Sequence, residues 1–219
     1  MSTLTPRLRA QVELAILAGI LKPVDKAKPH FGEGVVAVMC PDGDQAGKKQ
    51  FLAQLVTAQH GQERVHDVGK FHGGALVLSP TSPLSSMAPF LATALAILAP
   101  DRAAQWAIKL AQPLLGFAGR AIRLDLLLLS FLAIAIDMKK IRTVVLYVHA
   151  PCGAAQHAGL DFFDELRHLV AAKRFLKRRL GHLGLKVPCF VHVNFGGGQE
   201  ETYFVKTHEV EAWLAQVAP

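Results

Sequence analysis

The chain has 219 residues, of which 51% are apolar and 19% charged, and its formal net charge is +7. This composition excludes an intrinsically disordered chain and favours one globular domain with an embellishment. Three cysteines are too few for a disulfide framework, which indicates a reducing compartment and predicts a cytoplasmic protein. The moderate positive charge permits an acidic partner without requiring one.

The first expected element is an amphipathic helix over residues 6–21, which Thr5 and Pro6 open. Glu13 interrupts its apolar stretch and no small-residue cleavage site follows, so we interpret residues 1–30 as an N-terminal helical arm and not as a signal peptide. The longest uncharged apolar run, Leu126–Ile136, is shorter than the roughly 20 residues that a membrane span needs. The sequence therefore predicts no membrane span.

Apolar runs of strand length alternate with segments of helical spacing along most of the chain. The valine-rich run Val35–Cys40 is typical of a strand that is buried on both faces, as in a parallel sheet. Further strands are expected at 64–68, 143–149, 187–195 and 202–206, and helices at 44–59, 160–181 and 208–217. This alternation predicts an α/β fold with a mostly parallel central sheet and flanking helices.

One stretch breaks the alternation. Between about 79 and 142 the pattern is helical only, with helices expected at 87–98, 102–115 and 121–138. Only the last of these is needed as a crossover between two strands. We therefore interpret residues from about 80 to 120 as a helical insertion within a single domain that spans residues 1–219.

Two of the expected strands end in cysteine-containing turns, Cys40-Pro-Asp42-Gly-Asp44 and His149-Ala-Pro-Cys152-Gly153. Ligands of doubly wound sheets bind beyond the carboxyl ends of the strands, so Cys40, His149 and Cys152 converge there if the two strands are neighbours. Two thiolates and one imidazole are good zinc ligands, and three protein ligands with an open fourth position make a catalytic type of site. Asp42 either orients a water in that position or occupies it, and the sequence leaves both possibilities open.

These motifs resemble those of the beta-class carbonic anhydrases, which carry C-x-D-x-R after the first strand and H-x-x-C-G after the third. The resemblance covers residues from about 30 to 80 and 120 to 205, and Gly73-Gly74 loosely occupies the place of a family active-site loop. It implies the family's fold, Zn²⁺ bound by Cys40, His149 and Cys152, and Asp42 beside the zinc-bound water. It also implies a homodimer or higher homo-oligomer, in which the N-terminal helix can embrace the partner subunit.

The activity that the resemblance implies is that of a zinc lyase. Zinc-bound hydroxide attacks carbon dioxide, bicarbonate leaves, and a histidine passes the proton out; His66 and His72 are candidates for this transfer, and His157 is interpreted as an exposed residue at a helix start. The alternatives are a zinc hydrolase of another small substrate, such as carbonyl sulfide or carbon disulfide, and a catalytically degenerate member with a structural or interaction role. A small-molecule substrate is expected in the first two cases.

The chain departs from the family at Asp44, which stands where the family has an arginine that holds the aspartate off the metal. The negative charge of Asp44 lies close to Asp42 in the sequence, and like charges raise the pKa of a carboxyl group. Without the arginine, Asp42 is freer to ligate zinc. We take Asp42 and Asp44 as the candidate catalytic residues. Basic side chains that could replace the arginine are Lys48, Lys49, Lys70, Arg120 and Arg123.

Two further features have plainer interpretations. Cys189 lies inside an expected strand and is interpreted as a core residue. The basic run Lys173–Arg179 is interpreted as a solvated helix end, because it has neither interleaved aromatic residues nor a nucleic-acid-binding motif. No nucleic-acid partner is therefore expected.

Overall fold

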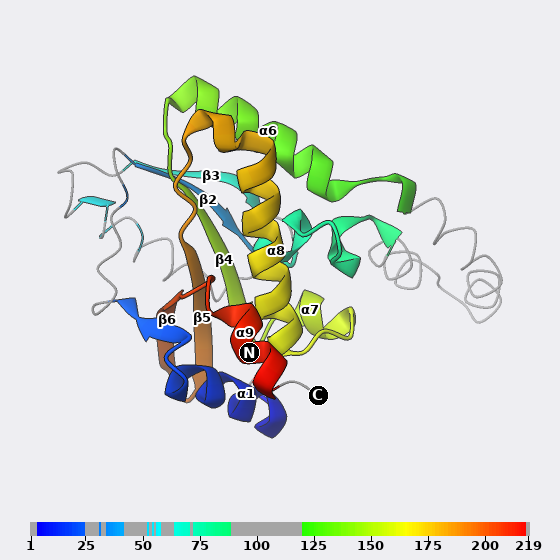
Figure 1. Cartoon of the computed structure of the whole chain (residues 1–219), viewed down its shortest axis with the longest axis vertical. Helices are drawn as coiled ribbons and strands as arrows, with labels where there is room; N and C mark the ends of the chain where they lie inside the picture. The colour runs from blue at the N-terminus through cyan, green and yellow to red at the C-terminus, as the bar shows by residue number, and fades with distance from the viewer. Residues whose placement is uncertain are drawn as a thin grey trace.

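The computed structural model describes residues 4–24, 31, 34–41, 52, 54, 56–57, 64–70, 72–88 and 120–217. In this part of the chain six strands form one mixed sheet with the order β1-β6-β5-β4-β2-β3 (Figure 1). The strands are β1 (Leu21–Pro23), β2 (Val35–Met39), β3 (Val65–Lys70), β4 (Val144–Ala150), β5 (Cys189–Gly196) and β6 (Gln199–Val205). The prediction of an α/β fold with a mostly parallel sheet is confirmed.

The parallel part of the sheet consists of β3, β2, β4 and β5, which are neighbours in that order. The β5–β6 and β6–β1 pairs are antiparallel. Gly197 and Gly198 lie between β5 and β6 with positive φ angles of 63° and 82°, a conformation that glycine adopts without a steric cost. The glycine run is therefore a hairpin turn. The short edge strand β1 was not predicted.

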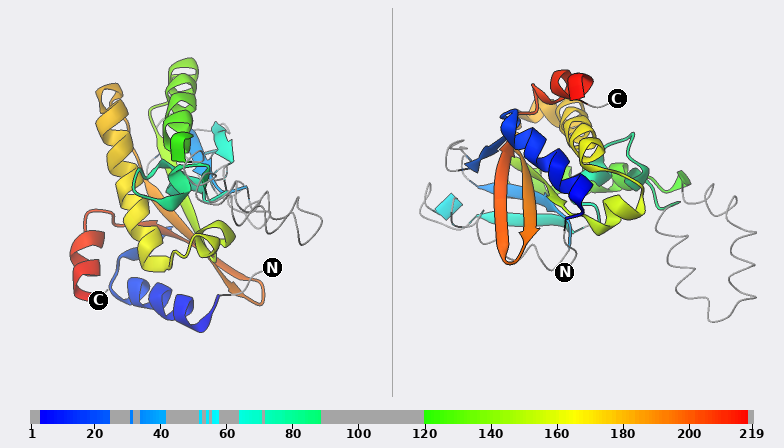
Figure 2. Two further views of the ribbon diagram at one scale, coloured as in Figure 1. Left: turned by 90° about the vertical axis from the view of Figure 1, so that its right-hand side faces the viewer. Right: turned by 90° about the horizontal axis from the view of Figure 1, so that it is seen from below.

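The described helices cover one face of the sheet (Figures 1 and 2). They are α1 (Pro6–Leu17), α6 (Leu124–Lys139), α7 (Gly153–His157), α8 (Phe162–Leu180) and α9 (Val210–Val217), with 3-10 turns η2 (Gly74–Leu78), η3 (Pro83–Ser85) and η4 (Gly181–Leu183). The expected helices at 121–138, 160–181 and 208–217 are thus confirmed. The helix expected at 6–21 ends earlier, at Leu17, because the chain turns at Gly19 with a φ of 68° and enters the sheet as β1, so the expected helical arm 1–30 also contains a strand. Those at 44–59, 87–98 and 102–115 lie largely or wholly outside the described residues.

The central strands are buried on both faces, which explains why β2 and β4 are continuous apolar runs. In β2, Val36 and Val38 pack with the helices in the larger core cluster. Val35, Ala37 and Met39 point to the opposite face, where Phe31, Leu52 and Val56 belong to a second cluster. No helix in the described part of the chain is long and apolar enough to cross a membrane.

The two ends of the expected insertion meet. Ser86 and Arg123 form an antiparallel bridge, and the backbone N–H of Met87 donates to the carbonyl of Ile122 at 3.2 Å. A segment inserted between η3 and α6 would have to leave and return at one place, and this pairing provides that place. The interpretation of residues 80–120 as an insertion stays a prediction, because most of the segment lies outside the described residues.

Helix α8 begins with a capping box that also anchors α1. Asp161 accepts hydrogen bonds from the backbone N–H groups of Phe163 and Asp164 at 3.0 and 3.1 Å. Its other carboxylate oxygen accepts from Gln11 at 2.9 Å and from Arg7 at 3.0 Å, both in α1. One aspartate therefore satisfies the free N–H groups of α8 and fixes the N-terminal helix to the same chain's core.

We expect Asp161→Ala to lower the free energy of unfolding by about 2 kcal/mol, because it removes a helix cap worth about 1 kcal/mol and the contacts to α1. Guanidinium denaturation followed by circular dichroism measures the change. Asp137→Ala is the control, since Asp137 forms an exposed ion pair with Lys140 that contributes at most about 0.5 kcal/mol. Equal losses in the two variants would contradict the capping role of Asp161.

Candidate metal centre

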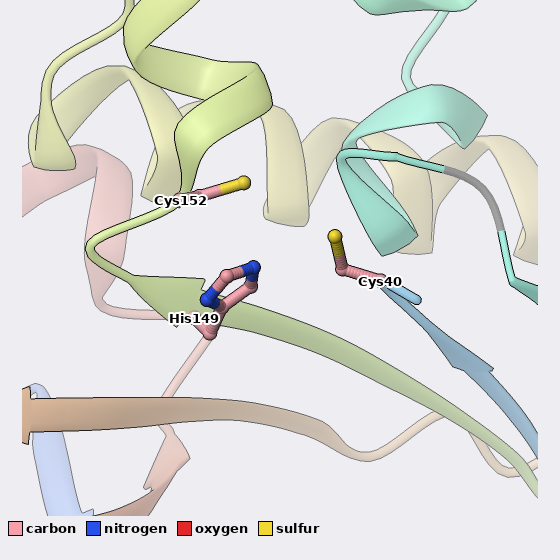
Figure 3. A group of neighbouring side chains, drawn as sticks. All are labelled: Cys40, His149 and Cys152. Atoms are coloured by element: carbon pink, nitrogen blue, oxygen red, sulfur yellow. The ribbon is translucent and has the colours of Figure 1, made fainter. Parts of the chain in front are cut away.

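The side chains of Cys40, His149 and Cys152 point toward one another at the carboxyl ends of two neighbouring strands (Figure 3). Cys40 follows the last residue of β2, His149 lies in β4, and Cys152 immediately precedes α7. The β2–β4 pair is parallel, with Val38 opposite Leu146. When this register is continued by two residues along both strands, Cys40 lies opposite Val148, which precedes His149. The convergence expected from the sequence is therefore confirmed.

The three side chains have the chemistry of a metal site. Their potential ligand atoms all lie within 4.8 Å of one another, and each residue is buried, with at most 5% of its surface exposed. Two sulfurs and one imidazole nitrogen form a donor set that suits Zn²⁺ and other borderline-soft ions. The trio is close enough to hold a metal ion, and three protein ligands leave a tetrahedral ion one open position.

The local electrostatics favour protonated thiols when no cation is present. The pKa of Cys152 is raised well above its ordinary value, first by a hydrogen bond with Cys40 and then by burial and by the negative charge of Glu165. A cation at the site reverses this preference, because thiolates are stabilised by direct coordination. Metal binding should therefore release protons.

A close backbone approach holds the first turn of η2 against both site strands. Gly74 has a φ of 53°, and a Cβ at this position would lie 2.8 Å from the backbone nitrogen of Cys40 and 2.9 Å from the carbonyl oxygen of Tyr147. Real Cβ atoms do not approach backbone atoms so closely, so only glycine fits without a shift. Gly74 therefore sets how closely the η2 segment packs on the backbone of Cys40 and of β4.

Sequence analysis missed one residue of this region, Glu165. It lies in the first turn of α8, it is completely buried, and neither of its carboxylate oxygens has a hydrogen-bond partner among the described residues. Burial and the negative charges of Asp161, Cys40 and Asp164 raise its pKa well above the ordinary value. The signal in the sequence is an acidic residue within an apolar helix face, between Phe162 and Leu169.

The structure describes only some of the other residues that were expected at the site. Asp42, Asp44, Lys48 and Lys49 lie outside the described residues, as does the side chain of Lys70. Arg120 is exposed. Arg123 donates to the buried carboxylate of Asp125 from both Nε, at 2.8 Å, and Nη2, at 2.5 Å. This ion pair holds its guanidinium group at the start of α6.

The histidines that sequence analysis considered near the site differ in exposure. His72 and His157 are exposed, and His66 is half-buried in β3. Cys189 is completely buried in β5, and its thiol donates to the carbonyl of Val187 at 3.9 Å. Cys189 is not one of the three converging residues, which confirms its interpretation as a core residue.

No family model, curated protein or solved structure matches this chain. The candidate site therefore stands on the geometry of the described residues and on the chemistry of their side chains.

We expect the purified chain to bind one equivalent of Zn²⁺, and Cys152→Ser to weaken its zinc affinity at least about a hundredfold, because a hydroxyl is a much poorer ligand than a thiolate. Competition with a chromophoric chelator and elemental analysis measure affinity and stoichiometry. Cys189→Ser is the matched control and should retain the metal. Full zinc affinity in Cys152→Ser would contradict the ligand assignment.

We expect Gly74→Ala to destabilise the chain by at least about 2 kcal/mol, since the new Cβ meets backbone atoms and the residue must keep a positive φ. Its zinc affinity should fall as well, because η2 must move away from Cys40. Gly181→Ala is the control, as a Cβ at that position meets nothing within 4 Å and φ is −62°. Denaturation and zinc competition of both variants give the comparison, and a Gly74→Ala protein as stable as Gly181→Ala would contradict the close approach.

Proposed function

We propose that this chain is a zinc-dependent lyase of the beta-carbonic anhydrase type, which reversibly hydrates carbon dioxide to bicarbonate. The observation that carries the proposal is the convergence of Cys40, His149 and Cys152 at the carboxyl ends of parallel strands. The family places its zinc ligands on the same two motifs. The fold resemblance, the identity of the metal and the cytoplasmic location all belong to this proposal.

The chain's own residues provide the setting for this chemistry. When bound by the three ligands, Zn²⁺ would lower the pKa of a water in its fourth position to about 7, which supplies a nucleophile for carbon dioxide. Cys40, His149 and Cys152 are buried, and burial strengthens electrostatic interactions at the atoms they would hold. Asp42 and Asp44 remain the candidate catalytic carboxylates on the turn after Cys40.

The net charge of the metal centre affects how strongly it holds an anionic product. Two thiolates neutralise a divalent ion, so the centre has no surplus positive charge with which to hold an anionic product. Bicarbonate should therefore leave readily, which suits reversible hydration. The same neutrality means that nearby carboxylates are not drawn to the ion by net charge, and their role depends on hydrogen bonds.

The proposal includes a homodimer or higher homo-oligomer. Helix α6 supports it, because the described residues leave much of its apolar surface uncovered. The large apolar side chains that are 42% to 71% exposed on this helix are Leu126, Leu127, Phe131, Ile134 and Met138. Helix α1 packs on α8 of its own chain through Arg7 and Gln11, with Leu17 at 84% exposure at its end.

We expect the zinc-loaded chain to accelerate carbon dioxide hydration in a stopped-flow indicator assay, with a rate that rises between pH 6.5 and 9. Cys152→Ser should lose at least about a hundredfold of this rate, because the site no longer holds the ion that activates water. Cys189→Ser is expected to keep it.

Two outcomes would change the proposal. A zinc-loaded chain without carbon dioxide hydration at any pH in that range contradicts the carbonic anhydrase activity. Hydrolysis of carbonyl sulfide by the same preparation, lost in Cys152→Ser, would assign the site to the alternative small substrate.

A further inference from the structure

The first turn of α8 carries three acidic side chains, Asp161 at the cap, Asp164 and Glu165. Acidic residues in this place are ordinarily explained by the free N–H groups and the positive dipole end of the helix. Asp161 caps the helix, and Asp164 accepts from the backbone N–H of Asp161 at 3.3 Å and from Arg167 at 2.8 Å. Capping therefore accounts for two of the three carboxylates and leaves Glu165 unexplained.

Glu165 turns into the protein. Its neighbours along the apolar face of α8, Phe162, Leu166 and Leu169, are completely buried core residues. An apolar side chain is the ordinary occupant of such a position. The described residues offer no hydrogen bond to either carboxylate oxygen. A buried polar group without a partner costs several kcal/mol, so a native protein rarely keeps one without a use for it.

The titratable groups of the described residues that act on the Glu165 carboxyl are Asp161 and Asp164 of its own helix and Cys40 at the end of β2. Each of them, when ionised, carries the same sign as Glu165. In turn, Glu165 acts on Cys152. Helix α8 packs directly on β4 and on η2, the two elements that border the site.

We propose that Glu165 is a positioning residue of the metal centre, where it accepts a hydrogen bond from the group in the open fourth position. This inference rests on the proposed metal centre. The carboxylate does not belong to the trio of ligand atoms within 4.8 Å, so we place it beside the ion and not on it. A water in the fourth position is a donor, which gives the buried carboxylate the partner that the described residues do not supply.

This role is the one that sequence analysis gave to Asp42. Glu165 offers it from a different element, a helix that the capping box and α1 hold in place. In the metal-loaded site the cation and the donor in the fourth position stabilise the ionised carboxylate, whose negative charge then opposes the entry of anions into that position. Substituting Glu165 should therefore change anion binding, a property that a purely structural side chain would not affect.

The test uses the cobalt-loaded full chain, because Co²⁺ replaces Zn²⁺ in Cys/His sites and reports its ligands by visible absorption. Thiocyanate is the probe for the fourth position. We expect Glu165→Gln to retain one Co²⁺ per chain and to bind thiocyanate about tenfold more tightly than the wild type, since an isosteric amide removes the charge. Glu165→Asp keeps the charge and should stay near the wild-type affinity.

Glu211→Gln is the matched control, since Glu211 is exposed in α9 and paired with Arg174. It should bind thiocyanate like the wild type. A second readout uses the metal-free proteins, in which Glu165→Leu should raise the midpoint of guanidinium unfolding, because an apolar side chain replaces an uncompensated buried carboxyl. A lower midpoint would indicate an ordinary structural contact and overturn the inference.

The outcomes separate the two proposals. A wild-type chain that binds Co²⁺ while Glu165→Gln matches its thiocyanate affinity within twofold overturns the role of Glu165 and leaves the metal centre intact. A wild-type chain that takes up neither Co²⁺ nor Zn²⁺ contradicts the metal centre, and the role of Glu165 with it.

Discussion

The parallel pairing of β2 with β4 is the constraint on which the candidate site depends. Val36, Ala37 and Val38 lie opposite Val144, Val145 and Leu146, and this register brings Cys40 beside the end of β4. Side chains alternate between the two faces of a strand, so a slip of one residue would move Cys40 to the other face of the sheet. The buried valines on both faces make such a slip costly, because every one of them would change its environment. Core packing therefore determines where the thiols lie.

Around this register, a few local features bring the surrounding segments into place. Gly74 lets η2 approach the backbone of Cys40 and Tyr147 more closely than any other residue would allow. Asp161 fixes the start of α8 and ties it to α1, so the turn that carries Glu165 has a defined position. Gly74 is distant from Cys40 in the chain and adjacent to its backbone in space. The site thus depends on backbone approach and helix capping as much as on its ligands.

Much of this arrangement could be predicted from the residues, and the exceptions have physical reasons. Long apolar runs identified β2 and β4, and the shared direction of parallel strands predicted that Cys40, His149 and Cys152 would meet. The three-residue strand β1 has too few positions to show a period. Glu165 escaped prediction because a single acid in the first helical turn resembles a cap, and only the fold shows that it points inward.

The contrast between Asp161 and Glu165 shows how one helix end serves two purposes. Both are carboxylates of the same turn, yet Asp161 satisfies backbone donors of its own helix and Glu165 satisfies none among the described residues. A helix dipole stabilises either charge only in part, and it cannot replace a hydrogen bond to a fully buried oxygen. Under the role proposed for Glu165, the donor is the group in the fourth position of the metal centre. Folding and metal binding should then be coupled, because the group that costs the metal-free protein stability is the one that acquires a partner when the site is filled.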